Sequence, residues 1–238
     1  MGRSRRPWEG DLTAEPEFLN LLPASLRRIL TSRLRVVRAP RGRTVIGAGN
    51  TSTDVFFVLE GELQILLYSF AGREVSVRDI GPGDMFGELA AIDGLPRSAT
   101  VIAMGDVRML IMNQADFLAC LEASPAASLF VARRLGAEVR RLTARIFELS
   151  ALNVQARLHC ELLRLARRDR NGDLTVNPAP THAELASRIG THREAVTREM
   201  RALVQMNVIR NRRRSLEFLD IEHLERVVSR QVGLLEAS

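Results

Sequence analysis

The chain has 238 residues, of which 46 % are hydrophobic, enough apolar material for one or two domains with their own cores. No run of about eighteen apolar residues occurs, so we expect no membrane-spanning helix. The formal net charge is +6, and residues 155–238 hold 15 Arg against 11 Asp and Glu, a surplus of +4. A basic C-terminal third favours a polyanionic partner such as nucleic acid.

The first residues are charged and lack the apolar core of a secretory signal, so we expect a cytoplasmic protein. Cys120 and Cys160 stand apart without metal-binding spacing, and the four His are scattered, so the sequence predicts no metal site. Every basic residue is Arg, the side chain best suited to bidentate recognition of phosphate and guanine.

Between Leu34 and Met112, short apolar runs alternate with turn residues. Runs such as VFFVLEGELQILLY, EVSVRDI and VRMLIM have the composition of strands, and glycines from Gly42 to Gly83 separate them. This pattern predicts an all-β sandwich or barrel.

The stretch FGELAAIDGLPRSATV, residues 86–101, places a Glu and an Arg in an otherwise core-like segment. A turn at Gly87 and Glu88 would start a short helix whose free N–H groups favour an anion. Arg97 could fold back and bind that anion bidentately, while Glu88 accepts hydrogen bonds from a sugar hydroxyl. A cyclic nucleotide offers both groups. The alternative is that Glu88 and Arg97 pair with each other.

Apolar residues at 132, 135, 139, 142, 146 and 149 follow alternating steps of three and four. This seam over residues 132–149 is typical of a heptad repeat and predicts a helix that pairs with a second copy. The alternative is a helix that packs on its own barrel.

Two further helices follow, each opened by a T-x-x-E pattern. Thr181 with Glu184 and Thr191 with Glu194 fit the capping box, and Gly190 lies between the helices. This arrangement predicts a helix-turn-helix whose second helix reads DNA. The segment VIRNRRRSLEFL then predicts a two-stranded wing, with Arg210 and Arg212–Arg214 as contacts that do not depend on DNA sequence.

The stretch 86–101 resembles the phosphate-binding cassette of cyclic-nucleotide-binding domains, and VLEG and GPGDM match the same family. With the C-terminal pattern, the chain is similar over residues 25–225 to transcription factors of the catabolite activator protein and fumarate-nitrate regulator superfamily. The resemblance implies an α+β protein: a cyclic-nucleotide-binding β jelly roll (1–124), a long dimerisation helix (125–152) and a winged helix-turn-helix (153–238).

The resemblance also implies a ligand, cyclic AMP and/or cyclic GMP. The implied ligand-binding residues are Gly87 and Glu88 at the ribose hydroxyl, Arg97, Ser98 and the Ala99 backbone at the phosphate, and Leu142 and Thr143 at the base. Leu89 is a further implied ligand-binding residue. In cyclic-AMP-responsive relatives both of the last two positions carry hydroxyls. Because Leu142 lacks one, the sequence favours modest selectivity between adenine and guanine.

THREAVTREM resembles the recognition helix of the cyclic-AMP-responsive branch and implies a palindromic, TGTGA-like DNA site. Arg193, Glu194 and Arg198 would read bases, whereas Thr181, Thr191 and His192 would contact phosphates. Glu194 has a competing role in its capping box. RNA polymerase is a further expected partner.

Other functions fit the sequence less well. No Cys precedes Cys120, which argues against an iron–sulfur centre, and no His precedes His159, which argues against haem. No nucleophile and base have matching spacing, so we expect no enzyme. A cyclic-nucleotide-binding module that acts on a protein partner remains the alternative function.

Overall fold

The computed structural model describes residues 16–68, 74–169 and 171–232. The chain divides into two compact units, residues 1–138 and 139–238, and the division falls inside the long helix α5 (Pro125–Ala151). The domain boundaries expected after residues 124 and 152 remain predictions.

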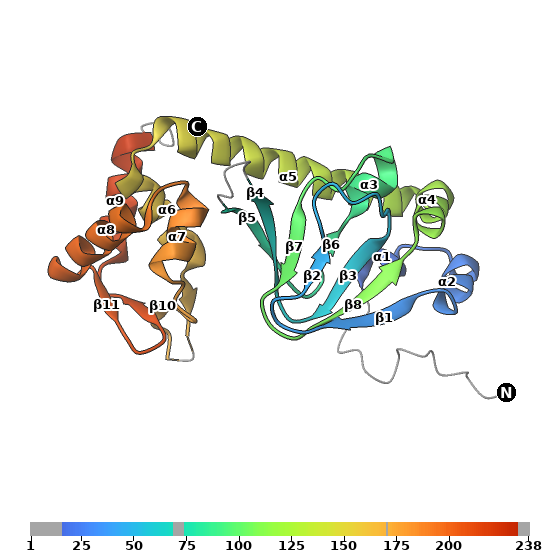
Figure 1. Ribbon diagram of the computed structural model, residues 1–238, viewed down its shortest axis with the longest axis horizontal. Coiled ribbons are helices and arrows are strands. Elements are labelled where there is room, and N and C mark those ends of the chain that lie inside the picture. The colour runs from blue at the N-terminus through green and yellow to red at the C-terminus, as the bar shows by residue number, and fades with distance from the viewer. Residues whose placement is uncertain (1–15, 69–73, 170, 233–238) are drawn as a thin grey trace. The chain divides into compact units, whose positions relative to one another are not determined.

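The first unit consists of two antiparallel four-stranded sheets with helices on one side (Figure 1). Its elements, in chain order up to α5, are α1 (Glu17–Asn20), α2 (Ala24–Thr31), β1 (Arg35–Ala39), β2 (Thr44–Ile46), β3 (Val55–Glu60), β4 (Leu63–Tyr68), β5 (Glu74–Ile80), β6 (Met85–Phe86), α3 (Glu88–Asp93), β7 (Thr100–Ala103), β8 (Val107–Met112) and α4 (Gln114–Ala123). The strand orders are β1-β8-β3-β6 and β2-β7-β4-β5, and one buried cluster contains residues of both sheets. The predicted jelly roll is confirmed.

The strands β3 and β8 are buried on both faces, which explains their continuous apolar sequences. Phe57 and Leu110 join the cluster formed with α1, α2 and α4, whereas Phe56, Val58 and Met109 face the second sheet. Those three helices were not predicted from the sequence. They cover the outer face of the sheet that contains β3 and β8.

The long helix α5 differs in burial along its length. Val131 is buried and Leu135 packs against the first unit's helical cluster, so the alternative of packing on the chain's own barrel holds for this part. Val139, Leu142 and Ile146 expose 62 %, 40 % and 64 % of their surfaces. An apolar seam therefore remains uncovered along the second half of the helix.

The second unit contains the end of α5 and a small helical fold with a sheet of order β11-β12-β10-β9. Its further elements are α6 (Val154–Leu165), β9 (Arg167–Arg168), β10 (Leu174–Val176), α7 (His182–Ile189), α8 (Arg193–Gln205), β11 (Ile209–Asn211), β12 (Leu216–Phe218) and α9 (Ile221–Val232). Helices α7 and α8 meet at Gly190, whose φ of 66° suits a left-handed turn that glycine adopts readily. The antiparallel pair β11–β12 forms the predicted wing.

Candidate functional site

The Gly-Glu turn of the cassette depends on the absence of a side chain at Gly87. Gly87 has φ 86° and precedes α3. A Cβ atom there would lie 2.6 Å from Nη1 of Arg97 and 2.8 Å from the backbone oxygen of Asp54. Only glycine fits between these groups without displacing one of them. The turn and the arginine ten residues later therefore form one packed unit.

Arg97 is held by the backbone around that turn. Its guanidinium donates to Gly87 O at 2.8 Å, to Asp54 O at 2.6 Å and to Ser52 Oγ at 3.2 Å. The residue is 4 % exposed, and its Cζ lies 5.9 Å from the Phe56 ring centroid. Burial lowers the pKa of this guanidinium, and nearby Asp54 and Glu88 oppose the shift. A buried cation preorganised in this way favours an anionic ligand.

Glu88 is not the partner of Arg97. Among the described residues, no ion pair or hydrogen bond joins the two side chains, so the alternative of mutual pairing is not what the structure contains. Burial raises the pKa of Glu88, while its own backbone N–H, Arg134 and Arg78 lower it and Glu138 raises it. A carboxyl oxygen of Glu88 can accept a hydroxyl hydrogen bond in either protonation state.

A small ionic cluster next to Glu88 connects the barrel to α5. Asp84 Oδ1 accepts from Arg78 at 2.7 Å and from Arg134 at 2.8 Å, and Arg78 also bonds Glu138 at 3.3 Å. Arg134 and Glu138 are thus the α5 residues that influence Glu88. Neither was predicted from the sequence, although they lie one helical turn apart on the face that contains Leu142.

Of the remaining predicted ligand residues, three belong to the first unit and two to the second. Ser98 and Leu89 are exposed, and Ala99 is half-buried. Leu142 and Thr143 belong to the second unit, are exposed, and the Thr143 hydroxyl donates to Val139 O at 2.9 Å. The structure brings Gly87, Glu88 and Arg97 together, and the assignment of a base contact to Leu142 and Thr143 stays a prediction.

The first of the two predicted capping boxes is formed, whereas α8 begins one residue later than the second box would place it. Thr181 accepts from Glu184 N at 3.2 Å, and the Glu184 carboxylate accepts from Thr181 N at 2.6 Å. Helix α8 instead begins at Arg193 after His192, which makes no side-chain capping bond. The capping role of Glu194 therefore stays a prediction.

The start of α8 presents an exposed polar face. Arg193, Glu194 and Arg198 are exposed, as base-reading residues must be. They line a hollow of about 640 Å³ together with residues at the same helical spacing: Thr197, Arg201, Ala202 and Gln205. Arg201 and Gln205 were not predicted from the sequence, although the steps of four from Arg193 and Thr197 could have identified them.

A hydrogen bond joins the first residue of α7 to the middle of α8. The Thr197 hydroxyl donates to Arg193 O at 2.9 Å and lies 2.9 Å from Nδ1 of His182, the first residue of α7. Since that hydroxyl already donates, the ring nitrogen is the donor in the second bond. On the wing, Arg210 and Arg212 both contact Glu217, at 3.4 Å and 3.1 Å.

Neither a metal-binding cluster nor a single helix fit to span a membrane occurs among the described residues. No group of three or more His, Cys, Asp or Glu among them is arranged to hold a metal ion. No single described helix is both long and apolar enough to cross a membrane, and only the sharply bent pair α4 and α5 meets that criterion when taken together.

Family comparisons match both units. The model "Cyclic nucleotide-binding domain" matches residues 36–124, which include the whole cassette. The model "Crp-like helix-turn-helix domain" matches residues 156–227, which include α7, α8 and the wing.

Similar proteins cover most of the chain. The CRP-like cAMP-activated global transcriptional regulator of Mycobacterium tuberculosis is 30 % identical over 83 % of this chain and 89 % of its own length. The cyclic AMP receptor protein of Thermus thermophilus is 27 % identical over 84 % and 90 %. A solved structure of a CRP-family transcriptional regulator from Thermus thermophilus has a TM-score of 0.67 and 27 % identity, and covers 81 % of this chain and 96 % of that one.

Proposed function

This chain belongs to the CRP-like family of transcription regulators, and from that premise we propose that it is a homodimer that binds cyclic AMP and reads a palindromic, TGTGA-like DNA site. The observation that carries the proposal is the buried Arg97 beside Gly87 and Glu88, in one chain with an exposed, arginine-rich helix start.

The cassette suits the two ends of a cyclic nucleotide. The Arg97 guanidinium would bind the phosphodiester, with the Ser98 hydroxyl and the Ala99 backbone beside it. Gly87 and Glu88 would hold the ribose hydroxyl, with Leu89 covering that side. Burial raises the pKa of Glu88, but a carboxyl group keeps an acceptor oxygen in either protonation state, so this role does not depend on its charge.

The base would face α5, with Leu142 and Thr143 as its contacts. A site rejects an analogue strongly when that analogue leaves buried polar groups of the protein unpaired. Leu142 has no such group, so cyclic GMP is expected to bind within about 1–2 kcal/mol of cyclic AMP, the value of one or two hydrogen bonds.

The uncovered seam of α5 would be the dimer interface within residues 132–149. Val139, Leu142 and Ile146 recur at heptad spacing and are exposed in the single chain. Two such helices would bury each other's apolar stripe and place the two helix-turn-helix motifs symmetrically, as a palindromic site requires.

DNA would be read from the start of α8. Arg193 and Arg198 can donate bidentately to guanine, and Glu194 can accept from a cytosine amino group. Thr181, Thr191 and His192 would contact phosphates. RNA polymerase is the proposed protein partner, with no surface residues assigned. The domain limits 1–124, 125–152 and 153–238 belong to the same proposal.

Calorimetry with cyclic AMP and cyclic GMP tests the ligand. Arg97→Leu should weaken binding at least tenfold, because charge-assisted hydrogen bonds contribute about 1.5–3 kcal/mol each. Arg41→Leu, at an exposed turn residue, is the matched control and should bind as the wild type does. Unchanged affinity in a folded Arg97→Leu protein would refute the cassette assignment.

The alternative function, a regulatory module for a protein partner, predicts ligand binding without specific DNA binding. A gel shift with each cyclic nucleotide separates the two functions.

A further inference from the structure

The junction between α5 and α6 is short and partly buried. Helix α5 ends at Ala151 and α6 begins at Val154, so two residues form the turn. Leu152 is 6 % exposed, and Asn153 caps α6 by accepting from Ala156 N at 2.9 Å. The backbone of such a turn sets where α6 starts. The angle between the helices is fixed by side chains on either side.

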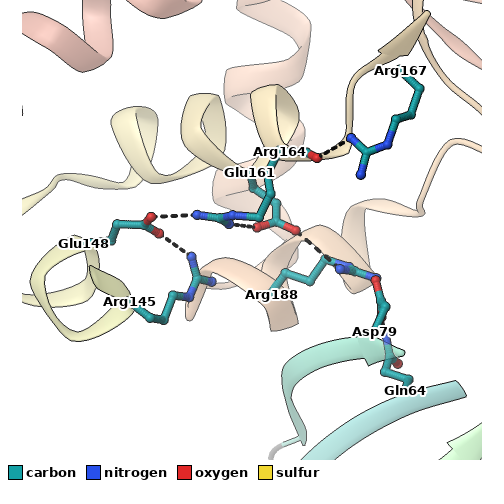
Figure 2. Close-up of polar contacts among 8 residues, drawn as sticks. All are labelled: Gln64, Asp79, Arg145, Glu148, Glu161, Arg164, Arg167 and Arg188. Atoms are coloured by element: carbon teal, nitrogen blue, oxygen red, sulfur yellow. Dashed lines mark hydrogen bonds and ion pairs between the residues drawn. The ribbon is translucent and has the colours of Figure 1, made fainter. Parts of the chain in front are cut away.

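Five charged side chains of alternating sign cross this junction (Figure 2). Glu148, in the last turn of α5, accepts from Arg145 at 2.6 Å and from Arg164 of α6 at 2.6 Å. Arg164 also pairs with Glu161, which bonds Arg188 of α7 at 3.3 Å. We call these five residues the junction network. It connects three successive helices, α5, α6 and α7.

Burial makes the junction network more than a set of surface ion pairs. The side chains of Glu161, Glu148 and Arg188 are 4 %, 15 % and 17 % exposed, whereas that of Arg164 is 47 % exposed. An exposed pair contributes little, but removing one partner of a buried pair leaves an uncompensated charge and is strongly unfavourable. A change of angle at the junction would separate Glu148 from Arg164, the pair of the network that joins α5 to α6. The network therefore resists bending between α5 and α6.

A second contact from the same turn of α5 reaches the same place. Leu149 Cδ2 lies 3.1 Å from the position of a Cβ atom built on Gly190, the turn between α7 and α8. Arg188, the α7 residue of the junction network, is two residues before that glycine. Neighbouring residues of α5 thus hold both the end of α7 and the turn from which the reading helix begins.

We propose that Glu148 and Arg164 are positioning residues that fasten the helix-turn-helix to the last turns of α5, so that the separation of the two reading helices in a dimer is fixed. This inference rests on the proposed function. Half-sites of a palindrome lie about one helical turn, roughly 34–36 Å, apart. A dimer whose reading helices are held rigidly on α5 accepts one half-site spacing and rejects others, without Glu148 or Arg164 touching a base.

The chain contains a native probe of this junction. Cys160 of α6 lies among the same charges: burial and Glu148 raise the pKa of its thiol, whereas Arg164 and Arg145 lower it. The chain's other thiol, Cys120, is buried, and desolvation together with Asp116 raises its pKa to about 12. An aromatic disulfide reagent will therefore react with the Cys160 thiol before it reacts with the Cys120 thiol.

The first experiment compares thiol labelling of full-length wild type, Glu148→Gln and Glu222→Gln over a range of pH. Glu222 pairs with Arg226 on α9, both side chains are exposed, and Glu222 is the matched control. Removing the Glu148 charge lowers the thiol pKa in any case, so the rate at high pH, where the thiol is fully ionised, is the deciding quantity. We expect Glu148→Gln to raise that limiting rate at least threefold, and Glu222→Gln to leave it unchanged. An unchanged limiting rate in Glu148→Gln would overturn the inference.

The second experiment measures DNA affinity, with cyclic AMP present, for duplexes whose half-sites are moved apart by one base pair or by half a turn. Wild type should discriminate between spacings by at least tenfold. Glu148→Gln should lose most of that discrimination while its cyclic AMP affinity stays the same, and Glu148→Asp, which restores the charge, should recover it. If Glu148→Gln discriminates between half-site spacings as strongly as the wild type does, the positioning role is contradicted.

The two experiments separate the inference from the function on which it rests. If the wild type binds no DNA at any spacing, the proposed function fails. The limiting rate of Cys160 labelling still decides whether Glu148 fastens the junction.

Discussion

Replacing Gly87 with Ala tests whether the packed turn of the cassette holds Arg97 in place. The matched control is Gly83→Ala. Both glycines have almost the same φ, 86° and 87°, so both alanines carry a similar backbone strain of about 1–2 kcal/mol. A Cβ atom at Gly83 meets nothing within 4 Å, whereas one at Gly87 meets Arg97 at 2.6 Å and the Asp54 backbone at 2.8 Å.

The two variants should therefore lose similar stability from strain but differ in ligand binding. The Asp54 oxygen belongs to the backbone and cannot move freely, so the guanidinium must shift, at an overpacking cost of about 1–3 kcal/mol. A displaced Arg97 would lose the contact with the phosphodiester that the proposed function assigns to it. We expect cyclic AMP affinity to fall at least tenfold in Gly87→Ala and by less than threefold in Gly83→Ala.

Calorimetric titration measures the affinity, and urea denaturation of both variants measures the loss of stability. If Gly87→Ala binds cyclic AMP as the wild type does, the close approach of Gly87 and Arg97 is irrelevant to the site. Equal losses of affinity in the two variants would attribute the effect to backbone strain alone.

Three further predictions concern the second unit and the dimer. Burial, and secondarily the charge of His223, lowers the pKa of His159 to about 4, below its ordinary value of about 6.5. Between pH ~6.5 and 4 the unfolded state binds this proton and the folded state does not, so the free energy of unfolding falls by up to about 3 kcal/mol as the pH drops through that range. Urea denaturation should show this slope in the wild type and lose it in His159→Leu. Leu142→Asp should sediment as a monomer, because two charges would meet in an apolar seam, and a persistent dimer would place the interface elsewhere. Glu194→Gln should relax discrimination at one base pair by about 1–3 kcal/mol in a binding-site selection, and unchanged discrimination there would remove Glu194 from base reading.

Periodicity and turn residues predicted most of the fold, because each element's burial follows from its own sequence. The alternating runs ending at Met112 became the jelly roll, and the patterns around Gly190 became the helix-turn-helix. The small helices α1, α2 and α4 were missed because they are short, with 4, 8 and 10 residues, and because the surface that buries them is the outer face of a sheet formed elsewhere in the chain.

The candidate site was predictable in its residue types but not in its contacts. Arg97 donates to the backbone of Gly87 and Asp54 rather than to the Glu88 carboxylate, a choice set by how β3 lies beside the turn. Helix α8 starts at Arg193, one residue later than the T-x-x-E pattern at Thr191 predicts, because the turn after Gly190 places it there. Long-range geometry of this kind leaves no local pattern in the sequence.

The central claim is that one chain couples a cyclic nucleotide to DNA reading. Fluorescence anisotropy of a palindromic, TGTGA-containing duplex, titrated with the protein with and without saturating cyclic AMP, tests it most directly. We predict at least about fivefold tighter DNA binding with the nucleotide, which is the lower end of the affinity change that coupled binding sites typically show. We also predict that this gain disappears in Arg97→Leu. Equal affinity with and without cyclic AMP in the wild type would contradict the coupling.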